Sequence, residues 1–378
     1  MSRRLFGLHP TVLVLASTHF MVDGFGNILT PLLPVIIPRL GLSLAAAGTL
    51  QMLYLMANSV SQLGFGHIAD RWRPRVLLMA GPLVAVSVVT LIGVTHNVWT
   101  LGAVLILGGL GAAAFHPPAA ALVHRYSGDR RGLSMVPWLM APGLLVVGLG
   151  LLPRLPRIDR LQEQHEASGG FRALVPYARP LTLLYLIVVL RTMTAATFTT
   201  FTPVMLVRRG MSVAQAGTVA AIFYMAVGAG GFFGGPLADR LGPRRVIVLS
   251  LISAVPFLFA APWLSGPSFI VVVAFGGFLL QSTLPVNVTF GQSLAPISAA
   301  TVSSLMMGFA WGMSGLSVPF TGMLADRIGI ERTMMVMAGV PLVAAALAWP
   351  LPAGKRAHTP RRPSETALPE VTGTDVAD

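Results

Sequence analysis

Long apolar runs separated by short polar segments follow one another along the chain. A helix that spans a bilayer needs about 20 mostly apolar residues, each adding about 1.5 Å of length. Because backbone groups find no water inside a bilayer, runs of this length must be helices. The pattern predicts about eleven membrane-spanning helices, near residues 12–37, 43–68, 76–95, 100–123, 133–152, 181–206, 213–238, 246–264, 268–292, 300–323 and 332–352.

The composition supports an integral membrane protein and narrows its partners. Of the 378 residues, 54% are hydrophobic and 10% are charged, and the mean hydropathy is +0.75. A soluble domain carries about 25% charged residues. The net charge of +13 comes from clusters in the short segments between runs, which argues against a nucleic-acid partner and for a lipid bilayer. Without cysteine, the chain has no disulfide and no cysteine metal site.

The basic clusters predict the orientation in the membrane. Residues 70–75, 124–131 and 239–245 are rich in Arg, whereas the loops between them are short and nearly neutral. Positive segments stay in the cytoplasm, so we expect both termini there, in a bacterial cytoplasmic (inner) membrane. Residues 154–179 are also Arg-rich, yet a single crossing by 133–152 places them outside. Either 133–152 does not span, or a helix of the pattern is absent.

An internal repeat divides the chain into two halves. The segment GFGHIADRWRPRV (64–76) matches GGPLADRLGPRRV (234–246), each at the end of a second helix. After this point the first half is about 31 residues shorter than the second, which equals one helix and a turn. Parallel repeats of six helices are a transporter architecture. We expect an N-terminal bundle of about five helices (1–152), a cytoplasmic linker (153–180), a C-terminal six-helix bundle (181–352) and a disordered tail (353–378).

The repeated segment resembles the signature loop of the major facilitator superfamily. Its glycines permit close helix approach, and its Asp can cap a helix N-terminus and pair with Arg, which latches one state of a transporter. Ordinary basic loops are the alternative. The first copy has Arg73 where the second has Gly242, and a third partial copy, GMLADRIG (322–329), lies outside by topology and so cannot be the same latch. The candidate gating residues are Gly66, Asp70, Arg71, Arg75, Gly235, Asp239, Arg240 and Arg244.

Further segments resemble the fosmidomycin-resistance-like branch of drug-efflux major facilitators. They are HFMVDG (19–24), GLGAAAFHP (109–117), LR (190–191), TFTPVML (200–206) and GMLADRIG, in the expected order. The resemblance implies an all-α membrane fold of two pseudo-symmetric helix bundles, here with the N-terminal half one helix short of six. It also implies proton-coupled export of a small drug-like or phosphonate-like compound.

Asp23 is an acid well inside an apolar run. A charge at the bilayer centre costs at least about 2.5 kcal/mol on insertion scales, so an ionisable residue there is a functional candidate. His19 lies four residues earlier and therefore on the same helix face, and imidazole titrates near neutral pH. We interpret the pair as a proton-coupling or substrate-binding site that faces a central cavity. A pair bonded to another helix for packing is the alternative.

Two further ionisable residues lie in apolar runs. Arg191 lies near mid-depth, where it is predicted to bind an anionic substrate group or to serve as counter-ion to Asp23; a structural ion pair or a solvated Arg is the alternative. His116 precedes Pro117 and Pro118, which we expect to kink or end its helix. The resembling family usually has an acid or polar residue shortly after this His-Pro, where this chain has a second Pro. Two roles for His116 therefore stay open: a proton role, and that of a helix-terminal His bonded to backbone.

Amides and glycines within the runs are weaker signals. The amides are predicted to line the cavity, although such residues also join transmembrane helices. Gly230/Gly234 and Gly231/Gly235 form two overlapping GxxxG pairs, which are typical of close helix packing. The candidate cavity-lining residues are Gln51, Asn58, Gln281 and Asn287.

The motifs of common enzymes are absent from the sequence, including the nucleotide-binding GxxxxGK[ST] and the nucleophile-elbow GxSxG. We expect no enzyme activity, no cofactor and no metal. The leading interpretation is a monomeric secondary transporter that exchanges protons for a small-molecule substrate by alternating access. Two alternatives stay open. One is proton-independent uptake or facilitated diffusion of an organic anion through Arg191. The other is a non-transporting truncated relic or membrane interaction protein, which the missing helix suggests.

Overall fold

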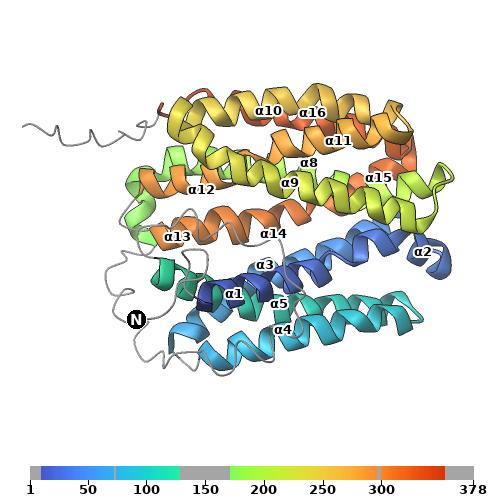
Figure 1. The fold of residues 1–378 in the computed structure, drawn as a ribbon, viewed down its shortest axis with the longest axis horizontal. Coiled ribbons are helices and arrows are strands. Elements are labelled where there is room, and N and C mark those ends of the chain that lie inside the picture. The colour runs from blue at the N-terminus through green and yellow to red at the C-terminus, as the bar shows by residue number, and fades with distance from the viewer. Residues whose placement is uncertain (1–9, 72–73, 128–170, 296–298, 354–378) are drawn as a thin grey trace, which may run out of the picture.

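The computed structural model describes residues 10–71, 74–127, 171–295 and 299–353, and every regular element in these ranges is a helix. Most helices run along the long axis of the molecule (Figure 1). The N-terminal half contains α1 (Pro10–Gly26), α2 (Leu29–Leu40), α3 (Leu44–Arg71), α4 (Pro74–Thr90) with a 3-10 turn (Leu91–Val94), and α5 (Val98–Ser127).

The C-terminal half follows a short 3-10 segment at Phe171–Tyr177. In the described residues, the predicted run 268–292 is split into two helices, α11 and α12. The predicted run 300–323 is split into shorter helices with a π-helical turn at Ser304–Phe309. Its helices are α8 (Ala178–Arg208), α9 (Val213–Leu241), α10 (Pro243–Ala260) with a 3-10 turn (Ala261–Trp263), α11 (Gly266–Gln281), α12 (Thr283–Leu294), α13 (Ala299–Ser303), α14 (Ala310–Gly315), α15 (Ser317–Ile328) and α16 (Ile330–Ala348).

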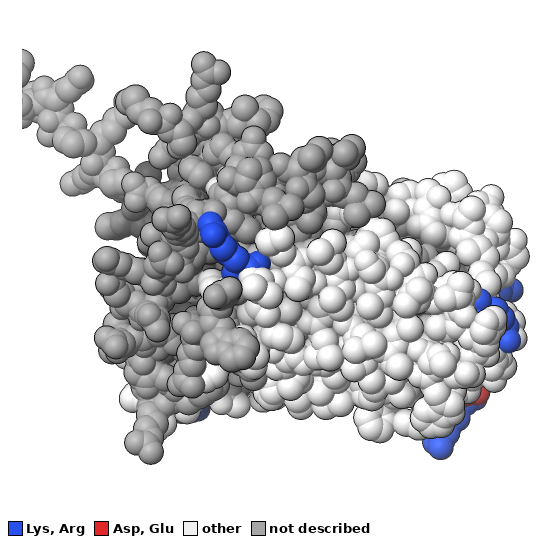
Figure 2. All heavy atoms as spheres, turned by 90° about the horizontal axis from the view of Figure 1, so that it is seen from below, with Lys and Arg blue, Asp and Glu red and all other residues white. Residues whose placement is uncertain are grey.

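The all-α membrane fold predicted from the apolar runs is confirmed. Eight helical segments of the described ranges are long and apolar enough to cross a bilayer. Large exposed apolar side chains, such as Leu249, Val271 and Val343, lie on the outside of these helices. Figure 2 shows an uncharged belt between ends that carry the charged side chains, as a bilayer requires. The predicted run 133–152, most of the linker 153–180 and nearly all of the tail 353–378 lie outside the described residues.

Prolines shape two helices of the N-terminal half. The first predicted run is divided between α1 and α2 at Asn27, because Pro31 has no N–H to donate to the Asn27 carbonyl. We expected Pro117 and Pro118 to kink or end their helix. The helix does not end there, because α5 continues to Ser127. Transmembrane helices tolerate proline when neighbouring groups compensate for the lost hydrogen bonds. His116 therefore lies within a helix and not at its end.

The two halves repeat a structural detail that the signature loop did not reveal. At the end of α2, the Arg39 guanidinium donates to the backbone carbonyls of Gly93 and Thr95, at 3.2 and 3.0 Å. At the end of α8, Arg209 donates to the carbonyl of Leu264 at 2.9 Å. In each half, the Arg that ends the first long helical segment thus binds the turn after the third. This correspondence supports the internal repeat.

The halves pack against each other along two seams. We name the end of the molecule where α2 ends and α3 begins the α2–α3 face, on the right in Figure 1. Near this face α2 packs against α8 and α9, and α3 packs against α14 and α15. Within the described residues, α1 instead packs mainly on α4 and α5 of its own half. The inter-half contacts of the first helical segment therefore concentrate toward the α2–α3 face.

Close packing inside the C-terminal half uses one of the two predicted GxxxG pairs. A Cβ added at Gly230 or Gly234 overlaps the backbone carbonyl oxygen of Phe278 or Ser282. Gly231 and Gly235 face open space within 4 Å. The backbone of α9 thus touches α11 at Gly230 and the residue just after α11 at Gly234, whereas the other pair does not contribute to this contact.

Candidate functional site

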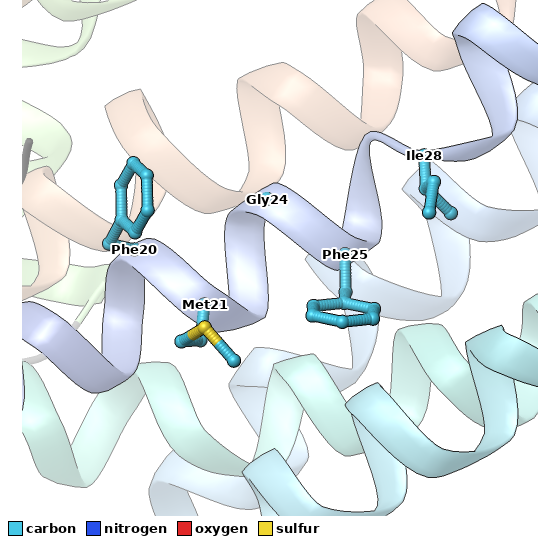
Figure 3. Close-up of a pocket in the computed structure, with 5 residues that line it drawn as sticks. All are labelled: Phe20, Met21, Gly24, Phe25 and Ile28. Atoms are coloured by element: carbon cyan, nitrogen blue, oxygen red, sulfur yellow. The ribbon is translucent and has the colours of Figure 1, made fainter. Parts of the chain in front are cut away.

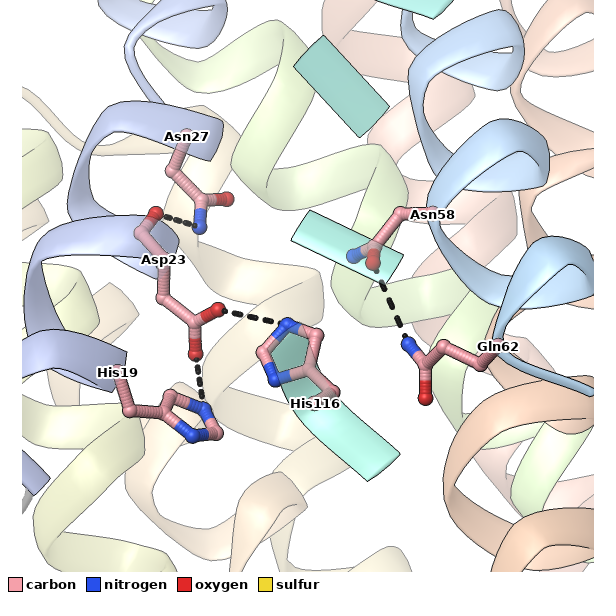
Figure 4. Close-up of polar contacts among 6 residues, drawn as sticks. All are labelled: His19, Asp23, Asn27, Asn58, Gln62 and His116. Carbon is pink, nitrogen blue, oxygen red and sulfur yellow. Dashed lines mark hydrogen bonds and ion pairs between the residues drawn. The ribbon is translucent and has the colours of Figure 1, made fainter. Parts of the chain in front are cut away.

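An acid and two histidines form a cluster in the N-terminal half (Figure 4). Asp23 Oδ2 lies 2.7 Å from His19 Nε2 on the same helix, and Asp23 Oδ1 lies 3.5 Å from His116 Nε2 on α5. The two imidazole rings meet edge to face, with centroids 4.6 Å apart. The Asp23 side chain is 49% exposed, while His19 and His116 are 23% and 14% exposed. The carboxylate thus joins α1 to α5 and still leaves half of its surface open.

The cluster follows from helical spacing and from the packing of α1 on α5. Residues four apart lie on one helix face, which places His19 beside Asp23 as the sequence predicted. For His116 a proton role and a helix-terminal position bonded to backbone were both open. The continuous α5 excludes the helix-terminal position and brings the His116 ring to the Asp23 carboxylate. Phe115, which is fully buried, packs its ring edge against His19 with centroids 6.1 Å apart. The apolar wall fixes the rings around the acid.

Two imidazoles and a carboxylate are also residue types that bind transition metals. The candidate ligand atoms of His19, Asp23 and His116 lie within 4.8 Å of one another. However, the direct His19–Asp23 contact already accounts for the arrangement without an ion. The expectation of no metal stays a prediction.

A chain of hydrogen bonds leads from this cluster to the opposite half. Asn27 Nδ2 donates to the Asp23 backbone carbonyl at 2.8 Å (Figure 4). The Tyr224 hydroxyl of α9 donates to Asn27 Oδ1 at 3.2 Å. Tyr54 of α3 lies so close to Gly26 that an added Cβ there overlaps the Tyr54 hydroxyl. The break between α1 and α2, one turn from Asp23, therefore touches both α3 and the C-terminal half.

Arg191 occupies a different kind of site in the C-terminal half. Its side chain is 0% exposed and has no acidic partner among the described residues. The guanidinium donates through Nη1 to Gln281 Oε1 and through Nη2 to Thr192 Oγ1, the latter at 2.9 Å, while Nε has no partner in the described ranges. A buried charge costs several kcal/mol unless it is compensated. The guanidinium is therefore a buried cation that only neutral groups compensate among the described residues.

The predicted ion pair between Asp23 and Arg191 is not formed in this structure. Asp23 contacts the two histidines of the N-terminal half, and Arg191 is bonded to neutral groups of the C-terminal half. The sequence placed each residue correctly inside an apolar run. Its suggestion that they are mutual counter-ions stays a prediction for another state of the protein.

The cavity-lining candidates separate into two groups. Gln51 and Asn287 are buried, and Gln51 Oε1 and both polar atoms of the Asn287 amide lack a hydrogen-bond partner among the described residues. Gln281 is bonded to Arg191. Asn58 Oδ1 accepts from Gln62 Nε2 at 3.3 Å on α3 (Figure 4). Buried amides without partners are costly, so Gln51 and Asn287 keep the capacity to bind a ligand or water.

The first signature-loop copy is only partly described. A Cβ added at Gly66 would lie 3.7 Å from the Pro117 Cβ of α5. Arg75 is exposed in the first turn of α4. The side chains of Asp70 and Arg71 lie outside the described part of the chain. The latch predicted for this copy stays a prediction.

The second copy binds within its own half. Asp239 and Arg240 are exposed at the end of α9. Arg244 donates to the carbonyl of Leu351 at 3.1 Å and lies over the Trp349 ring, 5.5 Å from its centroid. These contacts attach the start of α10 to the end of α16, so Arg244 stabilises the C-terminal bundle in this structure.

An apolar hollow of about 170 Å³ lies beside the polar stripe of α1 (Figure 3). It is lined by Phe20, Met21, Gly24, Phe25 and Ile28. The helical repeat places these residues on a face adjacent to that of His19 and Asp23. The first helical segment therefore presents an ionisable surface and an apolar surface side by side.

Two repeated helix bundles that carry buried ionisable groups define the protein as a membrane transporter. The family model of the Major Facilitator Superfamily matches residues 15–141 and 132–296, and the chain belongs to this family. It is 24% identical over 385 residues to the fosmidomycin resistance protein of Escherichia coli (strain K12), a match that covers 90% of this chain and 92% of that protein. It is 25% identical over 395 residues to the uncharacterized MFS-type transporter YfnC of Bacillus subtilis (strain 168), covering 92% and 94% of the two chains.

A solved structure supports the same fold. The bacterial homolog of the human lysosomal transporter Spinster, in an inward-facing and occupied conformation, superimposes with a TM-score of 0.70. It is 16% identical to this chain, and the alignment covers 90% of this chain and 95% of that chain. At this identity the likeness concerns the fold alone. The predicted resemblance to the major facilitator superfamily is therefore confirmed.

Sequence reasoning missed several residues that contact the site. Asn27 could have been found, because it continues the i, i+4 spacing of His19 and Asp23. Tyr54 and Tyr224 carried no such signal, since their contacts with Gly26 and Asn27 depend on how separate helices pack. Thr192, which binds Arg191, is its neighbour in sequence but is common among transmembrane helices.

Proposed function

We propose that this chain is a proton-coupled secondary transporter that exports a small drug-like or anionic compound by alternating access. The observation that carries the proposal is the cluster of Asp23 with His19 and His116, an ionisable group held between two helices of a membrane bundle. Ionisable residues at such positions mark ion and proton pathways. Family membership and similarity to a fosmidomycin resistance protein support export of such a compound.

In the proposed cycle, protonation of Asp23 favours the state open to the outside, and release of the proton to the cytoplasm accompanies cargo binding. His19 and His116 hold the carboxylate in place during the proposed cycle. The hollow lined by Phe20 and Phe25 offers an apolar surface to the cargo beside the titrating group. The basic segments place both termini in the cytoplasm in this proposal, with the α2–α3 face outside.

The test uses everted membrane vesicles and fosmidomycin as the probe. Respiration acidifies the vesicle lumen, and cargo added outside should release luminal protons through the wild-type protein. Asp23→Asn keeps the shape of the side chain and removes its titration, so we expect this proton movement to fall to the background. Glu331→Gln makes the same change in an exposed acid at the start of α16 and should leave it unchanged. Normal proton movement in Asp23→Asn rejects the coupling role.

A second candidate is proton-independent transport of an organic anion. The observation that favours it is Arg191, a fully buried cation without an acidic partner among the described residues. In this case fosmidomycin flux should persist after the proton gradient is collapsed with an uncoupler, and in Asp23→Asn. Flux that stops under both conditions supports the exchange mechanism instead.

A further inference from the structure

An acid of the C-terminal half caps a helix of the N-terminal half at the α2–α3 face. Asp326, in the last turn of α15, accepts hydrogen bonds from the backbone N–H groups of Leu44 and Ala45, each at 3.0 Å. These groups open α3, where the first N–H groups have no partner inside the helix. A carboxylate at this position also interacts favourably with the positive end of the helix dipole. The contact is thus both a cap and a charge interaction between the two halves.

The backbones of α3 and α15 approach closely beside this cap. A Cβ added at Gly322 overlaps the carbonyl oxygen of Leu44, and one added at Gly48 meets the backbone of Val318. Both glycines therefore permit the two helices to touch without side chains between them. The carboxylate of Asp326 reaches Leu44 and Ala45 because the helices are this close.

The turn that presents Asp326 is also found at the opposite end of the molecule. The segments ADRLG (238–242) and ADRIG (325–329) both end a helix with a glycine at φ 91°, and the next helix begins at the following residue. This left-handed backbone favours glycine. Asp239 in the first segment has no inter-half bond among the described residues, whereas Asp326 in the second has two. Among the residues that the structure describes in the three copies, it is Asp326 of the third, partial copy that bonds across the halves.

We propose that Asp326 is a latch that holds the α2–α3 face closed and must release α3 before the transporter opens at that face. We still expect that the 322–329 copy cannot act as the signature-loop latch. The proposed Asp326 latch acts on the opposite side of the membrane from the signature loop. The proposal rests on the alternating access proposed above. It requires neither a proton-coupling role for Asp23 nor any particular cargo.

The latch is tested by measuring the distance between the halves in the purified full chain without cargo. Because the protein has no cysteine, spin labels can be attached at His96→Cys, in the exposed turn before α5, and at Ala214→Cys, in the exposed first turn of α9. Double electron–electron resonance in lipid nanodiscs then reports the distance across the α2–α3 face. Asp326→Ala removes both hydrogen bonds, Asp326→Asn keeps the shape without the charge, and Arg327→Ala is the control on the neighbouring exposed residue.

We expect Asp326→Ala to raise the ratio of open to closed molecules about 5- to 30-fold, the range of a lost helix cap. Asp326→Asn should give an intermediate shift, and Arg327→Ala should match the wild type. Gly322→Ala, which wedges the same contact apart, should also favour the open population. An unchanged distance distribution in Asp326→Ala overturns the latch, and so does an equal shift in Arg327→Ala. Neither result depends on proton movement, so the latch and the coupling mechanism fail independently.

Discussion

The two halves of this transporter hold the ionisable residues of their apolar segments in opposite ways. In the N-terminal half, Asp23 is half exposed and lies against two imidazoles, which can themselves gain or lose a proton. In the C-terminal half, Arg191 is fully buried and is bonded to an amide and a hydroxyl, which cannot titrate. The first arrangement suits a group that changes its charge. The second suits a group that keeps its charge and lacks a counter-ion.

Under the proposed exchange mechanism, the two tasks of an exchanger fall to separate bundles. A carboxylate with an open side and titratable neighbours can pass a proton to water without rearranging the core. A guanidinium does not release its proton at physiological pH, so Arg191 can respond to an anion but not to the proton gradient. Coupling between the two then has to pass through contacts between the halves, such as the Tyr224–Asn27 hydrogen bond.

The largest effect should come from disturbing the close helix packing inside the C-terminal half. Gly234→Ala forces a methyl group against the Ser282 carbonyl, and because backbone atoms cannot rotate away, we expect a loss of about 3 kcal/mol in the free energy of unfolding. Gly231→Ala is the matched control, since its Cβ enters open space; it should change stability by less than about 0.5 kcal/mol. Thermal unfolding in detergent compares the two. Equal losses contradict the packing described here.

Arg191→Gln tests whether the buried cation serves ligand binding or folding. The variant removes an uncompensated charge but keeps hydrogen-bonding capacity, so thermal stability should be equal or higher. Fosmidomycin transport should fall about 100-fold, because a charge-assisted bond to the anion is lost. Arg208→Gln, the same change in the exposed last turn of α8, is the control for both measurements. A strong loss of stability with normal transport by the folded fraction identifies Arg191 as structural.

The smallest effect should come from the hydrogen bond between the halves. Tyr224→Phe removes the hydroxyl bonded to Asn27, worth about 1 kcal/mol. We expect about a fivefold fall in proton movement per fosmidomycin added, with little loss of stability. Tyr185→Phe removes a buried hydroxyl that has no hydrogen-bond partner among the described residues, and it should not reduce coupling. The proposed link between the halves is wrong if both variants behave alike.

The sequence predicted the elements of the fold better than their interruptions. Apolar runs determine where helices cross a bilayer, because each run must satisfy its own backbone there. The break at Asn27 and the continuation of α5 through Pro117 and Pro118 depend on neighbouring helices, which the run lengths do not describe. For the same reason, the two overlapping GxxxG pairs looked equivalent in the sequence. Of these four glycines, only Gly230 and Gly234 meet another backbone, at Phe278 and Ser282.

The candidate site was predictable where its residues share one helix. His19 and Asp23 follow the helical repeat, and their cost in a bilayer made them visible. His116 was named as a candidate from its place in an apolar run, but its contact with Asp23 depends on the packing of α1 against α5. Asp326 was excluded from the gating candidates because the predicted topology places its motif on the outer side of the membrane. Its role as a cap requires the register of α15 against α3, which a single sequence does not contain.

The two Arg clamps have a consequence for following the transport cycle. Arg39 ties α2 to the turn after α4, and Arg209 ties α8 to the turn after α10. Each pair of segments should therefore travel as a single body, whatever bending occurs at Asn27. Trp263, in the second of these turns and 75% exposed, is a natural fluorophore on that body. Its emission should report the displacement of α8 without any label attached to α8 itself.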